Sequence, residues 1–335
     1  MDHVRFGATG LKVSRLCLGT MSLGSSAWKG WVLDEEAAIP ILRRALDLGI
    51  TFFDMADWYS LGRNEEVVAR NLLRMVPRHE LVLATKVFYP MSEAPNDGGL
   101  SRAHIHASID ASLQRMGTDH VDLYIVHAFD PETPIEETME ALHDVVRAGK
   151  ARYLGASTMY AWQFAEMNAV ARQNVWTPFV DMQCQLSLLY REEEREMIPY
   201  CAHAGIAVTT FSPLARGYLA GGAPTARTKF DPFLEWFGDE VDVEIARRVR
   251  ELAAQRGVEP AAVAMAWVAG HPHITCPLIG ADAPEQVDAA VAAAAMSLSS
   301  DERAFLEAPY RPRDMINDYN PVRRPRAYAQ EGGEG

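Results

Sequence analysis

The sequence predicts an α/β protein that folds as a (β/α)8 TIM barrel, with an N-terminal β-hairpin cap and long loops at the C-terminal face. Eight short apolar runs alternate with helical patterns, roughly one run every 30 to 40 residues. Several runs are continuously apolar, as expected for parallel strands that are covered on both faces. This alternation favours a closed barrel over an open sheet, and 335 residues suffice for one barrel. The runs span residues 15–19, 50–53, 81–85, 121–126, 151–155, 179–183, 206–211 and 274–279.

The segments between the runs carry start and stop signals of helices. Thr133, Pro134 and Glu136 fit a capping box with Pro134 at the first helical position. Apolar residues then follow on one stripe until Gly149, which indicates the end of this helix. A glycine likewise follows the helices expected over 35–48 and 101–116.

Two further segments complete the expected architecture. Residues 4–6 and 12–13 flank a glycine-containing turn, which predicts a hairpin that caps the N-terminal end of the barrel. The connection 219–241 is too long for a simple turn, and we expect it to form a lid over the site. One domain is expected over 1–318, followed by a flexible C-terminal tail over 319–335.

Composition excludes several classes of function. A formal charge of −13 argues against nucleic acid and anionic membranes as partners. No apolar run approaches the roughly 20 residues that a membrane span needs, and the N-terminus has no signal pattern, so a cytoplasmic location is expected. The four cysteines lack metal-ligand spacing, which predicts reduced structural thiols and no metal site. The sequence leaves the oligomeric state open.

Four ionisable residues stand at or just beyond the ends of three successive predicted strands. Asp54 and Tyr59 follow the second run, Lys86 follows the third, and His127 follows the fourth. In a parallel α/β barrel the C-terminal ends of the strands converge on one face, where active sites are built. Tyrosine, lysine and histidine together are the parts of a proton-transfer site for a carbonyl group.

These residue types suggest a division of roles. Tyr59 is the expected general acid, although a tyrosine, with a reference pKa near 10, is a poor acid at neutral pH. The ammonium of Lys86 would lower that pKa by stabilising the phenolate, and Asp54 can hold the ammonium in place. His127 can donate a hydrogen bond to the substrate oxygen. Each residue alone is more often structural, since a tyrosine after a strand usually packs and a strand-end lysine is usually solvated.

The segments that carry these four residues resemble the aldo-keto reductases, and they match the family's Asp/Tyr/Lys/His tetrad in order and setting. The resemblance implies a (β/α)8 barrel that reduces small-molecule carbonyl compounds, usually with NADPH. It also favours the bacterial and fungal branch that acts on aryl alcohols, sugars and similar substrates. The matching segments are 52–59, 84–86, 122–127, 136–142 and 212–217, within a similarity that extends over about 6–310.

The resemblance also implies where the cofactor binds. Ser157 and Gln183 match positions that hold the nicotinamide carboxamide, and Phe211 matches an aromatic residue that stacks on the nicotinamide ring. Arg216 and nearby backbone N–H groups can face the pyrophosphate. The loop 280–286 matches the adenosine-phosphate loop, at a helix N-terminus that favours anions. The expected cofactor contacts are Thr20, Met21, Asp54, Ser157, Gln183, Phe211, Ser212, Leu214, Arg216, Gly217, Arg227, Gly280, Asp282 and Gln286.

Three departures from the family pattern bear on the cofactor. Thr158 and Ala290 each replace an asparagine, and Asp282 with Ala283 replaces the usual Ser or Thr, often with a Lys or Arg beside it. An acidic side chain is unfavourable beside a 2′-phosphate, whereas it can accept a hydrogen bond from a ribose hydroxyl. NADP(H) is therefore favoured, with NAD(H) as the alternative because of Asp282 and Ala283.

A different interpretation of Asp282 leaves the preference for NADP(H) intact. Asp282 can be the N-cap of the following helix, with Glu285 completing a capping box. Arg227 or Lys229 in the long connection would then supply the positive charge for the phosphate.

Aromatic residues are expected at the mouth of the site, where stacking would favour flat or sugar-like substrates, although some of them can be ordinary packing residues. The leading hypothesis is an NAD(P)H-dependent carbonyl reductase. The alternative is a cofactor-binding protein that regulates a partner, as the potassium-channel beta subunits do. The expected substrate contacts are Trp28, Trp31, Trp58, Phe88 and Trp236.

Overall fold

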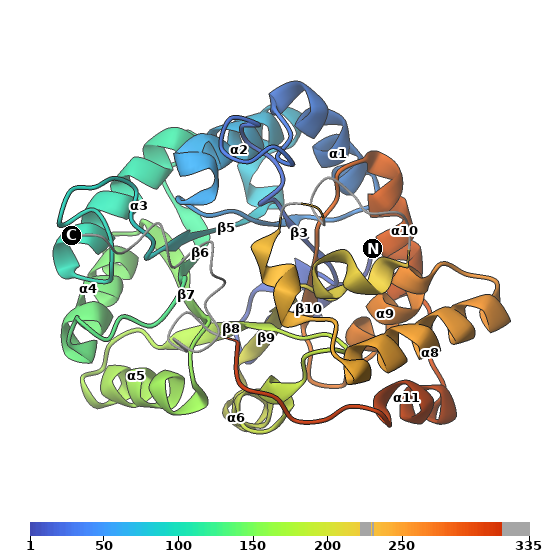
Figure 1. The fold of residues 1–335 in the computed structure, drawn as a ribbon. Helices are drawn as coiled ribbons and strands as arrows, with labels where there is room; N and C mark the ends of the chain where they lie inside the picture. Colours follow the sequence, from blue (N-terminus) through green and yellow to red (C-terminus); the bar gives the residue numbers. More distant parts are fainter. Residues whose placement is uncertain (222–228, 230, 317–335) are drawn as a thin grey trace.

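The computed structural model describes residues 1–221, 229 and 231–316, and their core is a closed barrel of eight strands (Figure 1). Neighbouring strands pair in parallel in the order β10-β3-β4-β5-β6-β7-β8-β9. The predicted fold class is therefore confirmed. The strands are β3 (Cys17–Gly19), β4 (Phe52–Asp54), β5 (Val82–Val87), β6 (Val121–Val126), β7 (Ala151–Ser157), β8 (Phe179–Gln185), β9 (Ala207–Phe211) and β10 (Cys276–Ile279).

Helices form a ring around the barrel (Figure 1). Among the described residues, no helix is both long and apolar enough to cross a membrane. The α-helices are α1 (Glu35–Asp47), α2 (Arg63–Met75), α3 (Arg102–Met116), α4 (Ile135–Arg147), α5 (Ala161–Gln173), α6 (Met197–Ala204), α8 (Glu240–Arg256), α9 (Pro260–Ala269), α10 (Pro284–Ala294) and α11 (Ser300–Glu307). Short 3-10 turns are η1 (Tyr59–Gly62), η2 (Arg78–Glu80), η3 (Glu192–Glu194), η4 (Ala215–Ala220) and η5 (Pro232–Trp236).

The expected N-terminal hairpin closes the end of the barrel at which the strands begin. Its strands β1 (His3–Arg5) and β2 (Lys12–Ser14) pair antiparallel. Phe6, just beyond β1, packs edge-on against Phe52 at the start of β4, with ring centroids 5.8 Å apart. Gly7 in the turn has φ +58°, and a Cβ there would lie 2.6 Å from a backbone oxygen of the loop before β9. Only glycine allows the turn to come this close to that backbone, and the hairpin therefore packs directly against the barrel.

Side-chain alternation along the strands places the site. Phe52 and Ala84 belong to a buried apolar cluster that includes Phe6 and Val13 of the hairpin segment. Asp54 and Lys86 follow them at the next inward-facing positions, because alternate residues of a strand share one face. The interior is thus apolar at its closed end and ionisable at its C-terminal end. The outward-facing residues of the strands belong to a second, larger cluster with the buried faces of the helices.

Two expected local features differ from the structure. Lys86 lies inside β5 rather than after it, since β5 continues to Val87. Thr133 does not cap α4: Pro134 is the N-cap, and the Thr133 hydroxyl instead donates to Asp130 Oδ2 at 2.7 Å. Asp130 also accepts the backbone N–H of Leu100 at 2.7 Å, so this carboxylate connects the loop after β5 with the loop after β6.

The remaining expectations concern thiols and connections. All four cysteines are buried free thiols, as predicted. The described ends of the connection 219–241 include η5, whereas 222–228 and 230 lie outside the described residues. Arg227 is among these, so its expected role at the phosphate stays a prediction. The expected tail over 319–335 also lies outside the described residues.

Candidate active site

The site is built around a buried ion pair between neighbouring strands. Asp54 is the last residue of β4, and Lys86 lies in β5 two residues beyond the partner of Asp54 in the strand register. Lys86 Nζ donates to Asp54 Oδ2 at 2.6 Å and to the Met55 carbonyl at 2.9 Å. Lys86 is 0% exposed and Asp54 is 2% exposed. The ammonium is therefore fixed by the barrel and shielded from bulk water.

Tyr59 and His127 complete the group that the sequence predicts. Tyr59 begins η1, and its hydroxyl lies 3.3 Å from Lys86 Nζ. His127 follows β6, and its ring lies edge-on to Tyr59 with centroids 5.7 Å apart. Residues from three adjacent strand ends thus meet at one point, because parallel strands place their carboxyl ends on the same face.

The charges of the site follow from this packing. Burial alone would lower the pKa of the Lys86 ammonium, but attraction to Asp54 and Tyr59 outweighs that effect and raises the pKa above its ordinary value. Burial, and then repulsion from Lys86, hold the pKa of the His127 imidazole well below its usual range. The site therefore contains a charged lysine beside a neutral histidine at neutral pH, and a neutral imidazole retains one N–H donor.

The segment that carries Tyr59 has an unusual backbone. Ser60, Leu61 and Gly62 all have positive φ, at 53°, 48° and 88°. Two consecutive non-glycine residues in the left-handed region are costly unless the surroundings hold them. This strained segment directly follows the tyrosine whose hydroxyl contacts Lys86.

A buried polar cluster behind the site holds this segment, and sequence reasoning missed it. Asp57 accepts hydrogen bonds from the Trp58 backbone N–H at 2.6 Å and from the Ser108 hydroxyl at 2.8 Å. Burial, and then the nearby charge of Glu65, raise the pKa of Asp57 to about 7. Its position two residues before Tyr59 was the available signal, but a partner on α3 cannot be read from local sequence.

Glu65 links the same cluster to the strand that carries Lys86. Its carboxylate accepts from the Thr85 hydroxyl at 2.5 Å and from Arg115 Nε at 2.6 Å. The Arg115 side chain in turn occupies the space that a side chain at Gly62 would need. One buried carboxylate therefore connects β5, α2 and α3 behind the tetrad.

The residues expected to hold the nicotinamide lie beside the tetrad. Ser157 and Gln183 are register partners on the adjacent strands β7 and β8. Gln183 Nε2 donates to Asp54 Oδ1 at 3.1 Å, and the Ser157 hydroxyl lies 3.1 Å from that of Thr158. The structure thus brings both residues to the ionisable end of the barrel.

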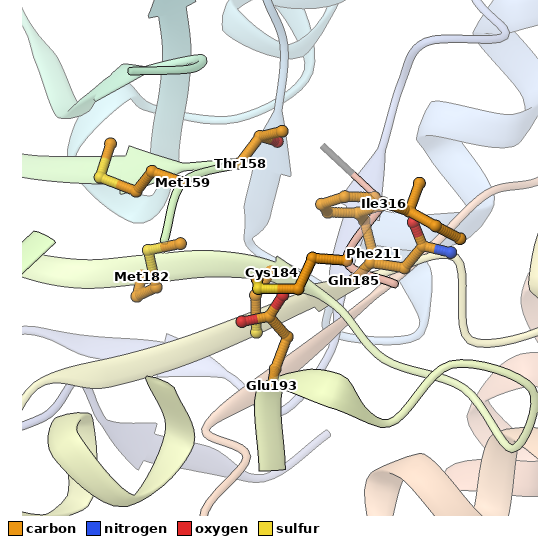
Figure 2. A pocket seen from close by; sticks show the side chains of 9 residues that line it. Thr158, Met159, Met182, Cys184, Gln185, Glu193, Phe211 and Ile316 are labelled. Carbon is orange, nitrogen blue, oxygen red and sulfur yellow. The ribbon is translucent and has the colours of Figure 1, made fainter. Parts of the chain in front are cut away.

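A small cavity opens at the ends of β7, β8 and β9 (Figure 2). Figure 2 shows Phe211, Gln185 and Ile316 together on one side of it, with Met159 and Met182 on the other. Phe211, expected to stack on nicotinamide, thus adjoins the last described residues of the chain. The full lining is Thr158, Met159, Met182, Cys184, Gln185, Glu193, Phe211, Met315 and Ile316.

The expected pyrophosphate segment follows β9. Ser212, Arg216 and Gly217 have positive φ, at 57°, 58° and 97°, and Leu214 is partly buried against the outer core. Arg216 forms a 2.8 Å ion pair with Asp231, and its guanidinium lies 4.3 Å from the ring centroid of Phe233. Arg216 Nε is buried and has no hydrogen-bond partner among the described residues. The long connection therefore engages this arginine directly.

The loop after β3 also contacts the tetrad. Thr20 donates its hydroxyl to the Asp54 carbonyl at 2.7 Å, and Met21 beside it is partly buried. Ser22 donates to the carbonyl of Ala281 at 3.1 Å, which connects this loop to the segment expected at the adenosine phosphate.

The expected capping role of Asp282 is wrong. Ala283 is the N-cap of α10, with no side-chain cap, and Asp282 is exposed one residue earlier. The N3 residue is Gln286 rather than Glu285, and its Oε1 accepts the Asp282 backbone N–H at 2.7 Å. Pro284 at the first helical position fixes this start, because a proline is well suited there and needs no N–H partner.

Aromatic rings contact one another in a row that ends at His127 of the tetrad. Trp28 meets Trp58 edge-on at 5.1 Å, Trp58 meets Tyr89 at 4.9 Å, and Tyr89 meets His127 at 4.9 Å between centroids. Phe88 packs on Tyr89 at 5.2 Å. Sequence reasoning missed Tyr89, although it lies three residues after Lys86.

The other two expected substrate residues, Trp31 and Trp236, belong to loops of the barrel. Trp31 is 7% exposed and packs inside the loop after β3. Trp236 packs against Phe233 in η5, with centroids 4.6 Å apart. In the described part of the chain, no group of three or more potential metal ligands is present.

Comparison with known proteins identifies the family. The model of the Aldo/keto reductase family matches residues 15–310. The chain is 41% identical to versiconal hemiacetal acetate reductase from Aspergillus parasiticus, over 93% of this chain and 98% of that protein. It is 40% identical to an aldo-keto reductase from Alternaria alternata, over 92% of each, and 38% identical to one from Metarhizium robertsii, over 93% of this chain and 92% of that protein. The chain is therefore an oxidoreductase that belongs to the aldo/keto reductase family.

Proposed function

We propose that this oxidoreductase uses NAD(P)H to reduce an aldehyde or ketone to the alcohol, with Tyr59 as the proton donor. The observation that carries the proposal is the contact of one buried ammonium with two partners. Lys86 Nζ lies 2.6 Å from Asp54 Oδ2 and 3.3 Å from the Tyr59 hydroxyl. A buried ion pair contributes little net stability, so its place beside a phenol supports a chemical role.

The residues of the tetrad divide the work of carbonyl reduction. When bound, NAD(P)H supplies the hydride for the carbonyl carbon. Tyr59 donates its proton to the carbonyl oxygen, and Lys86 stabilises the phenolate that remains until a solvent proton restores the tyrosine. Asp54 holds Lys86 in place, and the neutral His127 donates a hydrogen bond that orients the oxygen.

The chain offers groups that fit the cofactor. Arg216 has a buried Nε without a described partner, which suits an anion such as the pyrophosphate. Ser157 and Gln183 present a hydroxyl and an amide beside Asp54, where they can bind the nicotinamide carboxamide. Phe211 would stack on the nicotinamide ring from the end of β9.

The family generally uses NAD(P)H, and for this chain we favour NADP(H) with weak discrimination against NAD(H). The loop 280–286 meets the N-terminus of α10, which attracts anions, but Asp282 adds an exposed negative charge there. Ser212, Leu214, Gly217, Gly280 and Gln286 complete the proposed contacts to the phosphates and adenosine, with Thr20 and Met21 on the tetrad side.

A regulatory role like that of the potassium-channel beta subunits is not favoured. Cofactor binding without catalysis needs no proton donor, whereas here a buried ammonium contacts the tyrosine hydroxyl. We place the whole activity in a single domain over 1–318.

The test is consumption of NADPH, followed by its absorbance, with the reactive aldehyde 4-nitrobenzaldehyde, run in parallel with NADH. The expected result is cofactor oxidation that matches the alcohol formed mole for mole. Tight binding of NADPH without any alcohol from 4-nitrobenzaldehyde or a broader carbonyl panel would instead support the regulatory alternative.

A further inference from the structure

We propose that Asp57 is a positioning residue of the reaction, which holds the segment after β4 so that the Tyr59 hydroxyl stays on the Lys86 ammonium. This inference rests on the proposed carbonyl reduction and deepens it, because it names a residue that controls the proton donor from behind. Asp57 is 0% exposed, so it acts through other residues and not on the substrate.

The segment after β4 contacts Lys86 at alternate residues. The Met55 carbonyl accepts from Lys86 Nζ at 2.9 Å, and the Tyr59 hydroxyl lies 3.3 Å from the same atom. Between these two contacts, the Asp57 backbone N–H donates to the Lys86 carbonyl at 3.4 Å. Asp57 is thus the middle of three contacts that set the segment against β5, and a movement of Asp57 would carry Tyr59 with it.

The side chain of Asp57 anchors this segment to α3. One carboxylate oxygen accepts the Ser108 hydroxyl at 2.8 Å, and the other accepts the Trp58 backbone N–H at 2.6 Å. The Tyr124 hydroxyl on β6 interacts with Ser108 and donates to the Ile105 carbonyl at 3.3 Å. Ser108 and Tyr124 are buried as well, so water does not readily replace a lost carboxylate here.

The neighbouring charged groups behind the site are paired without Asp57. Glu65 on α2 accepts from the Thr85 hydroxyl at 2.5 Å and from Arg115 Nε at 2.6 Å. The Arg115 guanidinium on α3 also donates to Ser112 Oγ at 3.1 Å. A substitution at Asp57 therefore leaves these bonds in place, and its effect reports on the anchor of the tyrosine segment.

The protonation of Asp57 is compatible with this role. Burial, and then the charge of Glu65, raise the pKa of its carboxyl to about 7, so the group is partly protonated at neutral pH. The bond to Ser108 can form in both states, because a hydroxyl can donate or accept. A buried carboxyl with a shifted pKa beside a proton donor is typical of functional sites.

The test measures the pKa of the Tyr59 phenol by the ultraviolet absorbance of its phenolate. Each titration is corrected with the same protein carrying Tyr59→Phe, which isolates the signal of this tyrosine. Asp57→Ala should raise the pKa, because the phenolate is then less well placed beside the Lys86 ammonium. Asp57→Asn should restore the wild-type value, since asparagine offers an oxygen to the Trp58 N–H and an amide to the Ser108 hydroxyl.

Kinetics with 4-nitrobenzaldehyde provide the second measurement. Asp57→Ala should lower kcat by about tenfold, the size of one lost hydrogen bond, and leave KM and the Kd of NADPH nearly unchanged. The basic limb of the pH–rate profile should move upward together with the pKa of Tyr59. A lower melting temperature with an unchanged phenol pKa and an unchanged kcat would make Asp57 a structural residue and overturn the proposal.

Ser108→Ala removes the same anchor from the side of α3 by deleting a single oxygen, so it also serves if Asp57→Ala does not fold. It should raise the pKa of Tyr59 in the same direction by a smaller amount. The double variant should differ little from Asp57→Ala, because both changes break one bond. Fully additive effects on the phenol pKa would contradict an anchor that runs through this bond.

Asp122→Ala is the matched control. Asp122 also accepts a backbone N–H, that of Leu83 at 2.8 Å, and pairs with Arg78 at 2.8 Å. It lies at the start of β6, at the opposite end of the barrel from the tetrad. This variant should lower the melting temperature without moving the pKa of Tyr59, and an equal shift in Asp122→Ala and Asp57→Ala would overturn the proposal.

The titration needs neither substrate nor cofactor, so it separates this inference from the proposed function. Failure to reduce any carbonyl compound would count against the carbonyl reductase alone. A phenol pKa that is the same in the wild type and in folded Asp57→Ala and Ser108→Ala would overturn the inference about Asp57 alone.

Discussion

Lys86 Nζ lies 2.6 Å from Asp54 Oδ2 at the C-terminal end of the barrel interior, where both side chains are almost fully buried. Gln183 holds the other carboxylate oxygen at 3.1 Å, so Asp54 is fixed from two strands. The Lys86 ammonium also donates to the Met55 carbonyl, and the Tyr59 hydroxyl is its third partner. The ion pair thus connects the fold of the barrel to the group that we propose as the acid.

Replacing Lys86 with methionine tests the role of this charge. Lys86→Met should lower the rate of carbonyl reduction and move the basic limb of the pH–rate profile upward, because the phenolate of Tyr59 loses its counter-charge. Loss of one partner of a buried pair can also cost about 3–5 kcal/mol of folding free energy, so the melting temperature is measured alongside. An unchanged profile in a folded variant would make the lysine structural.

Asp54→Asn is the matched change on the other side of the pair. It leaves the ammonium in place but less well held, so the same upward shift is expected with smaller amplitude. Asparagine retains an oxygen acceptor for Lys86, which limits the loss of stability. A larger effect than that of Lys86→Met would contradict the order of roles.

Asp57 makes stability depend on pH through a group that does not touch the substrate. Its folded-state pKa of about 7 is raised from 3.8, mainly by burial and then by Glu65, while Ser108 and Arg115 act in the opposite direction. The folded state therefore binds this proton more tightly than the unfolded state does. Its stabilising contribution is present below about pH 4 and is lost as the pH rises through 7.

Thermal unfolding of Asp57→Asn at pH 5 and pH 8 checks this sign. Asparagine resembles the protonated carboxyl and cannot ionise, so the melting temperature of the variant minus that of the wild type should increase from pH 5 to pH 8. A difference that is the same at both pH values would show that Asp57 is not the titrating group.

Cofactor choice should be poorly defined in the wild type. Asp282 is exposed and is not the helix cap, and an acidic side chain is unfavourable beside a 2′-phosphate. We expect discrimination between NADPH and NADH within about tenfold, or about 1.4 kcal/mol. Asp282→Ser combined with Ala283→Lys should shift kcat/KM toward NADPH, and the shift should shrink as salt is added.

Arg227→Ala tests the rival account, in which the long connection supplies the phosphate charge. The comparison is the ratio of kcat/KM for the two cofactors in the wild type and in this variant. A hundredfold preference for NADPH that only Arg227→Ala abolishes would contradict the role given to Asp282.

Much of the fold could be predicted because its signals are local. A parallel strand covered on both faces leaves a continuous apolar run, and β6 has the predicted bounds of 121–126. The ends of β4, β5, β7 and β8 were predicted one or two residues too early. Lys86 and Ser157 are polar residues inside strands, and they face the interior end of the barrel where the site lies.

The partners within the site could be predicted only in part. Asp54, Lys86 and His127 follow strand runs, and that placement predicts a shared face. The bond from Ser108 to Asp57 joins α3 to a loop distant in sequence, and no periodicity encodes it. The same holds for Arg216 and Asp231, whose pairing depends on the path of the long connection.

The most direct test of the central claim is the rate of carbonyl reduction by Tyr59→Phe, measured with 4-nitrobenzaldehyde and saturating NADPH. Phenylalanine keeps the ring that packs against His127 and removes only the hydroxyl. The rate should fall by at least about 10²-fold, the low end for general acid catalysis, while NADPH binding by fluorescence quenching stays nearly unchanged. A variant that reduces the aldehyde at the wild-type rate would contradict the assignment of Tyr59 as the proton donor.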